Sequence, residues 1–297
     1  MSLTAIIVLT LKFSIALSVF SLGLKATLSD ATFLFSRPEK LLNSLISMYI
    51  AMPLFAVTVA LLFNLTPAVK IALVMLSISP IPPILPGKAM KTGGRECYAI
   101  GLLVVGSLLS IVMIPLVLEL FQVVFDMPLQ MTARSVALIV LESVLVPLAA
   151  GIAVHALWPS VAERIARPVS IVGAVSLFAA SVPVFIAQGQ DMLSLIGNGT
   201  FAALGAFALL GLVIGHILGG PRFEDRPVLA LYSSARHPGV AVAIAQVNFP
   251  QQRVALAAIA LALIVAAILS LPYMNWVKHR KPVDEGEASH TGRSARA

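Results

Sequence analysis

Two short stretches decide the fold, because each interrupts a long apolar run with proline and glycine. The first is Ser79-Pro80-Ile81-Pro82-Pro83-Ile84-Leu85-Pro86-Gly87, and the second is Ser233-Ser234-Ala235-Arg236-His237-Pro238-Gly239. The four prolines of the first stretch cannot lie in a continuous helix, since proline lacks an N–H donor and clashes with the preceding turn. Each stretch therefore predicts a helix that stops and restarts inside an apolar run.

The composition places these stretches in a membrane. Of the 297 residues, 59% are apolar and only 11% are charged, and the mean hydropathy is +0.99. An ordinary soluble domain has roughly 25% charged residues. These values exclude a soluble enzyme, a coiled coil and a disordered protein, and they predict an all-α polytopic membrane protein. The single cysteine, Cys97, excludes an internal disulfide and a cysteine-rich metal site.

Nine apolar stretches are long enough to cross a membrane, which takes about 20 residues for a helix. They are too long and continuous for the strands of a barrel. The first contains Lys12 and no basic region precedes it, so it is predicted to be a retained helix rather than a signal peptide. The nine predicted spans are Thr4–Leu24, Leu41–Phe63, Pro67–Met90, Cys97–Phe121, Ser135–Leu157, Pro168–Ala187, Phe201–Leu218, Pro227–Val247 and Val254–Val277.

The basic residues predict the orientation. Three of them, Lys70, Arg134 and Arg253, fall in one alternating set of connections, and 13 fall in the other. Because basic residues near helix ends stay in the cytoplasm, the rich set faces the cytosol, the N-terminus lies outside and the C-terminus inside. The net charge of +7 thus reflects topology in the cell (inner) membrane, and a nucleic-acid partner is not expected. Residues 1–281 are predicted to form one transmembrane domain, and the polar residues 282–297 are predicted to be a disordered cytoplasmic tail.

The two interruptions occupy corresponding places in the chain. After the first, Arg95 precedes Pro115 by 20 residues; after the second, Arg253 precedes Pro272 by 19. Spans 1–4 and 6–9 are therefore predicted to be inverted repeats, with span 5 unmatched. Interrupted segments in matching halves indicate a transport site near the midplane of the membrane. The alternative, in which the prolines only kink packed helices, accounts less well for two equivalent interruptions.

The sequence resembles the bile acid:sodium symporter family in four segments: 20–24, 77–94, 144–155 and 239–249. The resemblance implies a core domain with two crossing broken helices, a smaller panel domain and alternating access between them. It also implies uptake of organic anions, in many members together with sodium. Spans 3, 4, 6, 7, 8 and 9 would form the core, and spans 1, 2 and 5 the panel.

The sequence departs from that family where sodium-coupled members carry their sodium ligands. The family has a Ser-Asn pair in the first broken helix, a Glu-x-Gly-x-Gln-Asn segment in the second, and hydroxyls in the helix after the first. Sodium, like other hard cations, prefers several oxygen ligands. Both sodium sites are therefore predicted to be absent, with no metal and no cofactor expected, because the matching positions hold Leu85, Pro86, Tyr232, Arg236, His237, Ala99 and Leu103.

Arg236 is the strongest candidate for a functional residue. A charge inside a span costs at least about 2.5–3.5 kcal/mol, and a guanidinium suits carboxylate, sulfate or phosphate. Arg236 either contacts the substrate or acts as a structural cation that satisfies exposed carbonyls. His237 either bonds a freed carbonyl or takes part in proton coupling. The other candidates for substrate binding lie beside these two: Ser233, Ser234, Gly239, Pro86, Gly87 and Lys88.

Lys88 either draws anions to the cytosolic mouth or extends to the lipid headgroups. Lys12 and Glu142 lie at similar depth in spans 1 and 5 and are predicted to form an ion pair, with Glu142 as a proton carrier as the alternative.

These features predict a secondary transporter of a small organic anion that works without sodium. A sodium-coupled symporter is the first alternative. A membrane-embedded enzyme is a less favoured alternative, because the sequence shows no carboxylate pair and no nucleophile with a base. A channel is also less favoured, because the sequence shows no rings of pore-lining residues. The sequence contains no Gly-rich phosphate-binding motif that would indicate transport driven by ATP. The substrate, the coupling ion and the oligomeric state are not predicted by the sequence.

Overall fold

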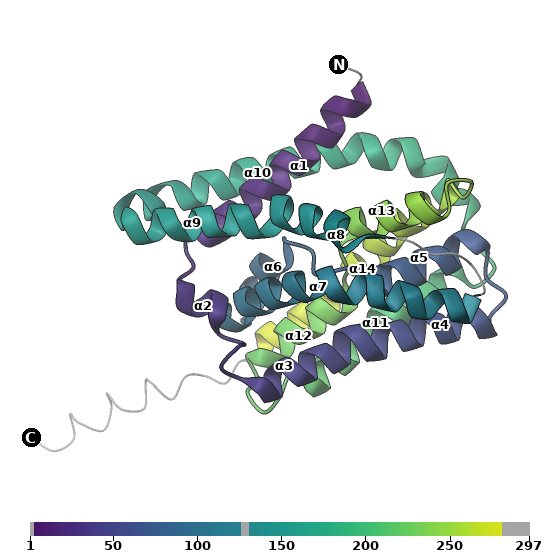
Figure 1. Cartoon of the computed structure of the whole chain (residues 1–297), viewed down its shortest axis with the longest axis horizontal. Coiled ribbons are helices and arrows are strands. Elements are labelled where there is room, and N and C mark those ends of the chain that lie inside the picture. The colour runs from purple at the N-terminus through teal and green to yellow at the C-terminus, as the bar shows by residue number, and fades with distance from the viewer. Residues whose placement is uncertain (1–2, 126–130, 281–297) are drawn as a thin grey trace, which may run out of the picture.

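The structure is a computed structural model, and it describes residues 3–125 and 131–280. Within these ranges every regular element is a helix. Figure 1 shows the helices in two layers, with α1, α9 and α10 on one side and α3, α4, α11 and α12 on the other. The predicted tail, residues 282–297, lies outside the described residues.

Each of the nine predicted apolar stretches is helical. Continuous helices cover five of them, of which α10 is longer than predicted, and in the other four the helix is divided by a π-helical turn or by an interruption. The elements are α1 (Leu3–Gly23), α3 (Pro38–Leu45) with η1 (Ile46–Ala51) and α4 (Met52–Leu62), α5 (Pro67–Ile78) with α6 (Leu85–Lys91), α7 (Glu96–Phe125), α8 (Ala133–Val140) with η2 (Leu141–Leu145) and α9 (Val146–Leu157), α10 (Pro159–Ser194), α11 (Thr200–Leu218), α12 (Asp225–Ser234) with α13 (Pro238–Asn248), and α14 (Val254–His279).

Six helical stretches in the described part of the chain are long and apolar enough to cross a membrane. Shorter apolar helices cover Leu9–Gly23 and Pro67–Ile78. The structure is therefore that of a polytopic membrane protein, as the composition predicts. The six stretches are Pro38–Leu62, Glu96–Val123, Ala133–Leu157, Pro159–Ser194, Thr200–Leu218 and Val254–His279.

The two interruptions predicted from proline and glycine are present, and they meet. Helix α5 ends at Ile78 and α6 begins at Leu85; α12 ends at Ser234 and α13 begins at Pro238. The backbone N–H of His237 donates to the carbonyl of Pro80 over 2.9 Å. Each unwound segment thus satisfies part of the other's backbone, which a membrane interior requires.

A panel is formed by α1, α9 and α10, which pack chiefly on one another. Gly23 and Gly151 allow α1 and α9 to touch, since a Cβ on Gly151 would lie 2.7 Å from the Cα of Gly23. The resemblance had implied a panel of spans 1, 2 and 5, and this assignment is wrong for two helices. Span 6, which is α10, packs along α1, whereas span 2 packs on α5 and α11 through α4.

The remaining helices form a core with two buried apolar clusters. One cluster joins α4, α5, α11, α13 and α14 to α8 and to the second half of α7. The other surrounds the first interruption, and it joins α7 and α12 to Val19 and Leu22 of α1, Val144 of η2 and Leu148 of α9. The panel therefore contacts the core beside the first interruption.

Two helices contain a π-helical turn that the sequence did not predict. The turn η1 precedes Pro53 in span 2, and η2 precedes Pro147 in span 5. Proline removes a hydrogen bond of the helix and clashes with the carbonyl four residues earlier, so a wider turn next to it is physically reasonable. Such turns leave backbone carbonyls available to other partners.

A short helix, α2 (Leu28–Thr32), follows span 1 and was also not predicted. It begins with a capping box in which the Thr27 side chain and the Asp30 carboxylate each bond the other's backbone N–H. Gly101 of α7 lies against it, because a Cβ there would be 3.1 Å from the carbonyl oxygen of Asp30.

Candidate functional site

Arg236 lies in the gap between α12 and α13 and is 1% exposed. Its Nη2 donates to the carbonyl of Met48, in the π-helical turn η1. Its Nη1 lies 3.5 Å from the carbonyl of Ser79, where the first interruption begins. The guanidinium therefore joins both broken helices and span 2 through backbone carbonyls, the contacts predicted for a structural cation.

The positive charge of Arg236 is not balanced by an acidic side chain among the described residues, where the two ion pairs are Lys12–Glu142 and Lys40–Asp225. The Nε of Arg236 is buried without a partner. A cavity of about 20 Å³ beside it is lined by Arg236, Ser234 and apolar residues of α5, α11 and α14. That volume holds about one water molecule. In this conformation the cavity is too small for an organic anion.

His237 is the N-cap of α13. Its Nδ1 accepts a hydrogen bond of 3.4 Å from the N–H of Val240, which satisfies one donor of the helix start. An accepting Nδ1 places the proton of the neutral ring on Nε2, which is buried without a partner among the described residues. The backbone bond to Pro80 and the cap give His237 a structural role, although the ring accepts from an N–H rather than donating to a carbonyl.

The serines near the interruptions satisfy nearby groups. The hydroxyl of Ser233 lies 2.6 Å from that of Ser47, and Ser234 donates to the carbonyl of Leu231 over 3.1 Å. Ser77 and Ser79 bond carbonyls three and four residues earlier. Such bonds are what serine in a membrane helix usually makes. Of these four contacts, the one between Ser47 and Ser233 joins two elements, and the other three stay within their own helix.

Gly87, Lys88 and Gly239 are less buried than Arg236 and His237. A Cβ added to Gly87 would meet nothing within 4 Å, and Gly239 is exposed. Lys88 is half-buried, whereas its neighbour Pro86 is buried. The candidate residues therefore divide into a buried cationic set and a more exposed set, called the open side below, in the first turns of α6 and α13, where backbone N–H groups attract negative charge.

A comparison with known protein families identifies the family of the chain. The model of the Sodium Bile acid symporter family matches residues 12–195, more than half of the chain and including the first interruption. The chain belongs to this family. No curated protein matches the sequence as a relative. Membership of the Sodium Bile acid symporter family makes the chain a membrane transporter.

The positions at which the family resemblance places sodium ligands are filled by other groups. The phenol of Tyr232 donates to the carbonyl of Ala99 over 2.8 Å. Leu85 and Leu103 belong to the same buried cluster as these two residues. In the second broken helix, where the family resemblance places a glutamine, the guanidinium of Arg236 donates to the carbonyls of Met48 and Ser79.

Lys12 and Glu142 are brought together by α1 and η2. The Nζ of Lys12 lies 3.3 Å from Oε2 of Glu142, and their side chains are 68% and 64% exposed. This pair is distinct from the buried groups at the crossing and joins α1 to the π-helical turn that precedes α9.

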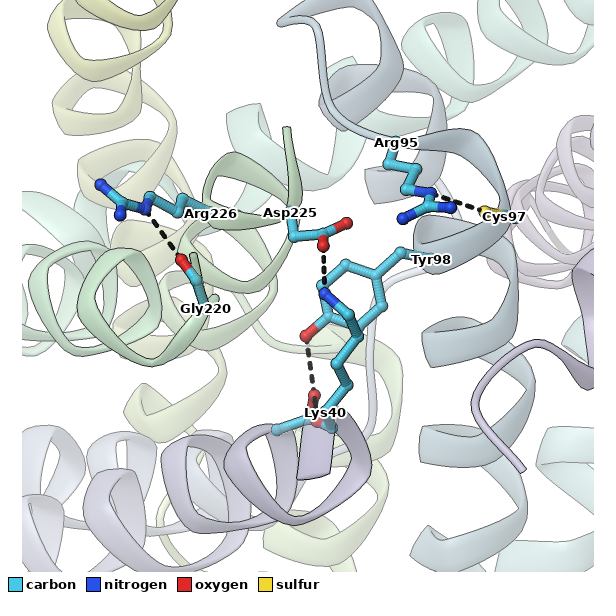
Figure 2. A network of polar contacts seen from close by, with 8 residues as sticks. Lys40, Arg95, Cys97, Tyr98, Gly220, Asp225 and Arg226 are labelled. Carbon is cyan, nitrogen blue, oxygen red and sulfur yellow. Dashed lines mark hydrogen bonds and ion pairs between the residues drawn. The ribbon is translucent and has the colours of Figure 1, made fainter. Parts of the chain in front are cut away.

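A polar network that sequence reasoning missed lies at the start of α12 (Figure 2). The ammonium of Lys40, in α3, pairs with the buried carboxylate of Asp225. Ser44 and Tyr98 share a hydrogen bond of 2.8 Å, and the N–H of Arg95 donates to the carbonyl of Glu224 over 3.1 Å. The network fastens the start of α12 to α3 and α7. One signal was available: both charged partners stand at the same predicted face of the membrane.

Proposed function

We propose that this chain is a secondary active transporter that carries a small organic anion by alternating access and works without sodium. One observation carries the proposal. A buried guanidinium donates to carbonyls at the crossing of two broken helices, where the family resemblance places a cation. A fixed positive charge at that place does the structural work of a bound cation and makes the crossing attractive to negative solutes.

The open side of the crossing is the proposed contact surface for the anion. The first turn of α13 presents the N–H of Gly239, and α6 presents Gly87 and Lys88 beside unfilled space. Helix starts and an ammonium group both favour carboxylates and sulfonates. Arg236 acts on the anion through its charge rather than by contact, because its guanidinium donates to the carbonyls of Met48 and Ser79.

The proposed architecture has nine spans, with the N-terminus outside and the C-terminus inside, in two inverted repeats. Three pairs of elements support the repeat. Helices α1 and α10 both belong to the panel, α5–α6 and α12–α13 are both interrupted, and α7 and α14 both contain proline within a long helix. The panel and the core are then the two bodies that move relative to each other in the cell membrane.

Two measurements test the proposal. Purified protein is screened by thermal shift against small carboxylates and sulfonates, and hits are tested for uptake into vesicles in sodium or in choline buffer. We expect an anion that raises the melting temperature, equal uptake in both buffers, and loss of the thermal shift in Arg236→Ala. Arg226→Ala is the matched control, since Arg226 also donates to a carbonyl, that of Gly220, over 3.0 Å, but at the start of α12.

Loss of uptake in choline would replace this proposal with sodium-coupled symport. A thermal shift that survives Arg236→Ala unchanged would remove Arg236 from anion binding.

A further inference from the structure

The Lys12–Glu142 pair is unusual because both charges are exposed although they lie far from the ends of apolar helices. Lys12 is nine residues, about 14 Å, from the start of α1, and Glu142 is equally far from Ala133, where its helical stretch begins. Exposed charges at such depth are costly in hydrocarbon and are found facing water or protein instead. The exposed side of this pair is therefore expected to face water.

The position of the pair along α1 indicates where this water-filled space lies. Val19 lies seven residues after Lys12, on the same face of α1, and Val144 lies two residues after Glu142. Both valines are buried in the cluster that contains Ile81 of the first interruption. Lys12 thus lies on the face of α1 that makes this contact, about two turns before it, whereas Glu142 meets Lys12 from the face of η2 opposite to Val144.

The geometry of the pair leaves capacity for another ligand. The ammonium of Lys12 donates to one carboxylate oxygen of Glu142 over 3.3 Å, and an ammonium has three donors. Glu142 lies in the π-helical turn η2, a feature often found at functional sites. An exposed ion pair is weak, on the order of 0–1 kcal/mol, so a second anion can compete with Glu142 for Lys12.

We propose that the Lys12–Glu142 pair faces an aqueous entrance between panel and core, and that Lys12 is a second binding position for an organic carboxylate or sulfonate, which displaces Glu142. The identity of the solute as an organic anion rests on the proposed function. The proposal that this surface faces water and attracts anions does not. Glu142 then acts as a built-in competitor that keeps Lys12 paired when no solute is present.

The test uses cysteine labelling with two membrane-impermeant methanethiosulfonates, one carrying a sulfonate and one a trimethylammonium group. Cys97→Ser removes the single cysteine of the chain. Glu142→Cys is then labelled from outside right-side-out vesicles, with and without Lys12→Gln. We expect the sulfonate reagent to react about tenfold faster when Lys12 is present, the factor that about 1.4 kcal/mol of Coulomb attraction gives.

The reciprocal variant, Lys12→Cys, is expected to prefer the cationic reagent, because Glu142 then faces the thiol. Phe13→Cys is the matched control, since Phe13 is 58% exposed on the same helix but points about 100° away. We expect no labelling there.

Two results would overturn the proposal: labelling at positions 12 and 142 as slow as at position 13, or a rate at Glu142→Cys that does not depend on Lys12. Neither depends on uptake, so failure here is separate from failure of the transport assay.

Discussion

Arg236→Gln removes the buried positive charge at the crossing and leaves a shorter side chain that reaches fewer partners. Hydrogen bonds from a charged donor contribute about 1.5–3 kcal/mol each, but the wild type also bears the cost of burying the guanidinium. We therefore expect the free energy of unfolding to fall by about 1–3 kcal/mol, the cost of leaving one buried carbonyl, that of Met48 or Ser79, without a donor. At roughly 2–4 °C for each kcal/mol, the melting temperature should fall by roughly 2–12 °C in choline buffer.

Sodium should reverse part of that loss in the variant alone. Removal of the guanidinium frees carbonyl oxygens that a small cation can use, and glutamine is the residue of the sodium-coupled family members at this position. Sodium at ten times its dissociation constant would add about 1.4 kcal/mol of stability. The assay is thermal unfolding in detergent with sodium against choline, and Arg226→Gln is the control that should lose stability without responding to sodium.

The reasoning would be refuted by either of two results. A wild-type protein stabilised by sodium over choline would mean that a sodium site is present beside the guanidinium. An Arg236→Gln variant as stable as the wild type in choline would mean that the carbonyl contacts of Arg236 do not hold the crossing together.

Two further predictions concern packing and charge away from the crossing. Asp225→Asn leaves the ammonium of Lys40 without its acid and should lower the free energy of unfolding by about 3–5 kcal/mol, as measured by thermal unfolding. The double variant Lys40→Met/Asp225→Leu removes both charges and should recover most of that loss. A double variant as unstable as the single one would contradict this. Gly151→Ala should lower stability by about 1–3 kcal/mol, since the new Cβ meets Gly23. Gly189→Ala, where a Cβ meets nothing within 4 Å, should not; equal losses would show that the α1–α9 contact is not close.

Much of the fold follows from local sequence. Apolar length placed all nine helical stretches, and proline and glycine placed both interruptions, because these signals depend on a residue's own chemistry. The short helix α2 also has a local signal in the sequence, since Thr27 and Asp30 have the spacing of a capping box. The π-helical turns had no such signal, since the pattern of apolar residues does not distinguish one wide turn.

The assignment of helices to panel and core failed because it followed a family outline rather than the repeat. If spans 1–4 and 6–9 correspond, span 6 takes the place equivalent to span 1, and both belong to the panel. The contacts of α10 with α1 fit that reasoning.

The site was predictable in its charges but not in its partners. A charge inside an apolar run identified Arg236, Lys12 and Glu142. The groups that receive Arg236 are backbone carbonyls of Met48 and Ser79, and every residue has a carbonyl, so their identity depends on how the chain is folded. Asp225 was missed because its carboxylate pairs with Lys40, which is far away in the sequence.

The π-helical turn η1 has a consequence for how one helix divides its side chains. Met48 and Tyr49, within the turn, belong to the cluster around the first interruption, whereas Met52 and Ala56, just after it, belong to the other cluster. One additional residue in a turn rotates everything beyond it by about 100°. Deleting a single residue from Ile46–Ala51 would thus keep the helix but change its phase, so that Lys40 and Ser44 would turn away from Asp225 and Tyr98.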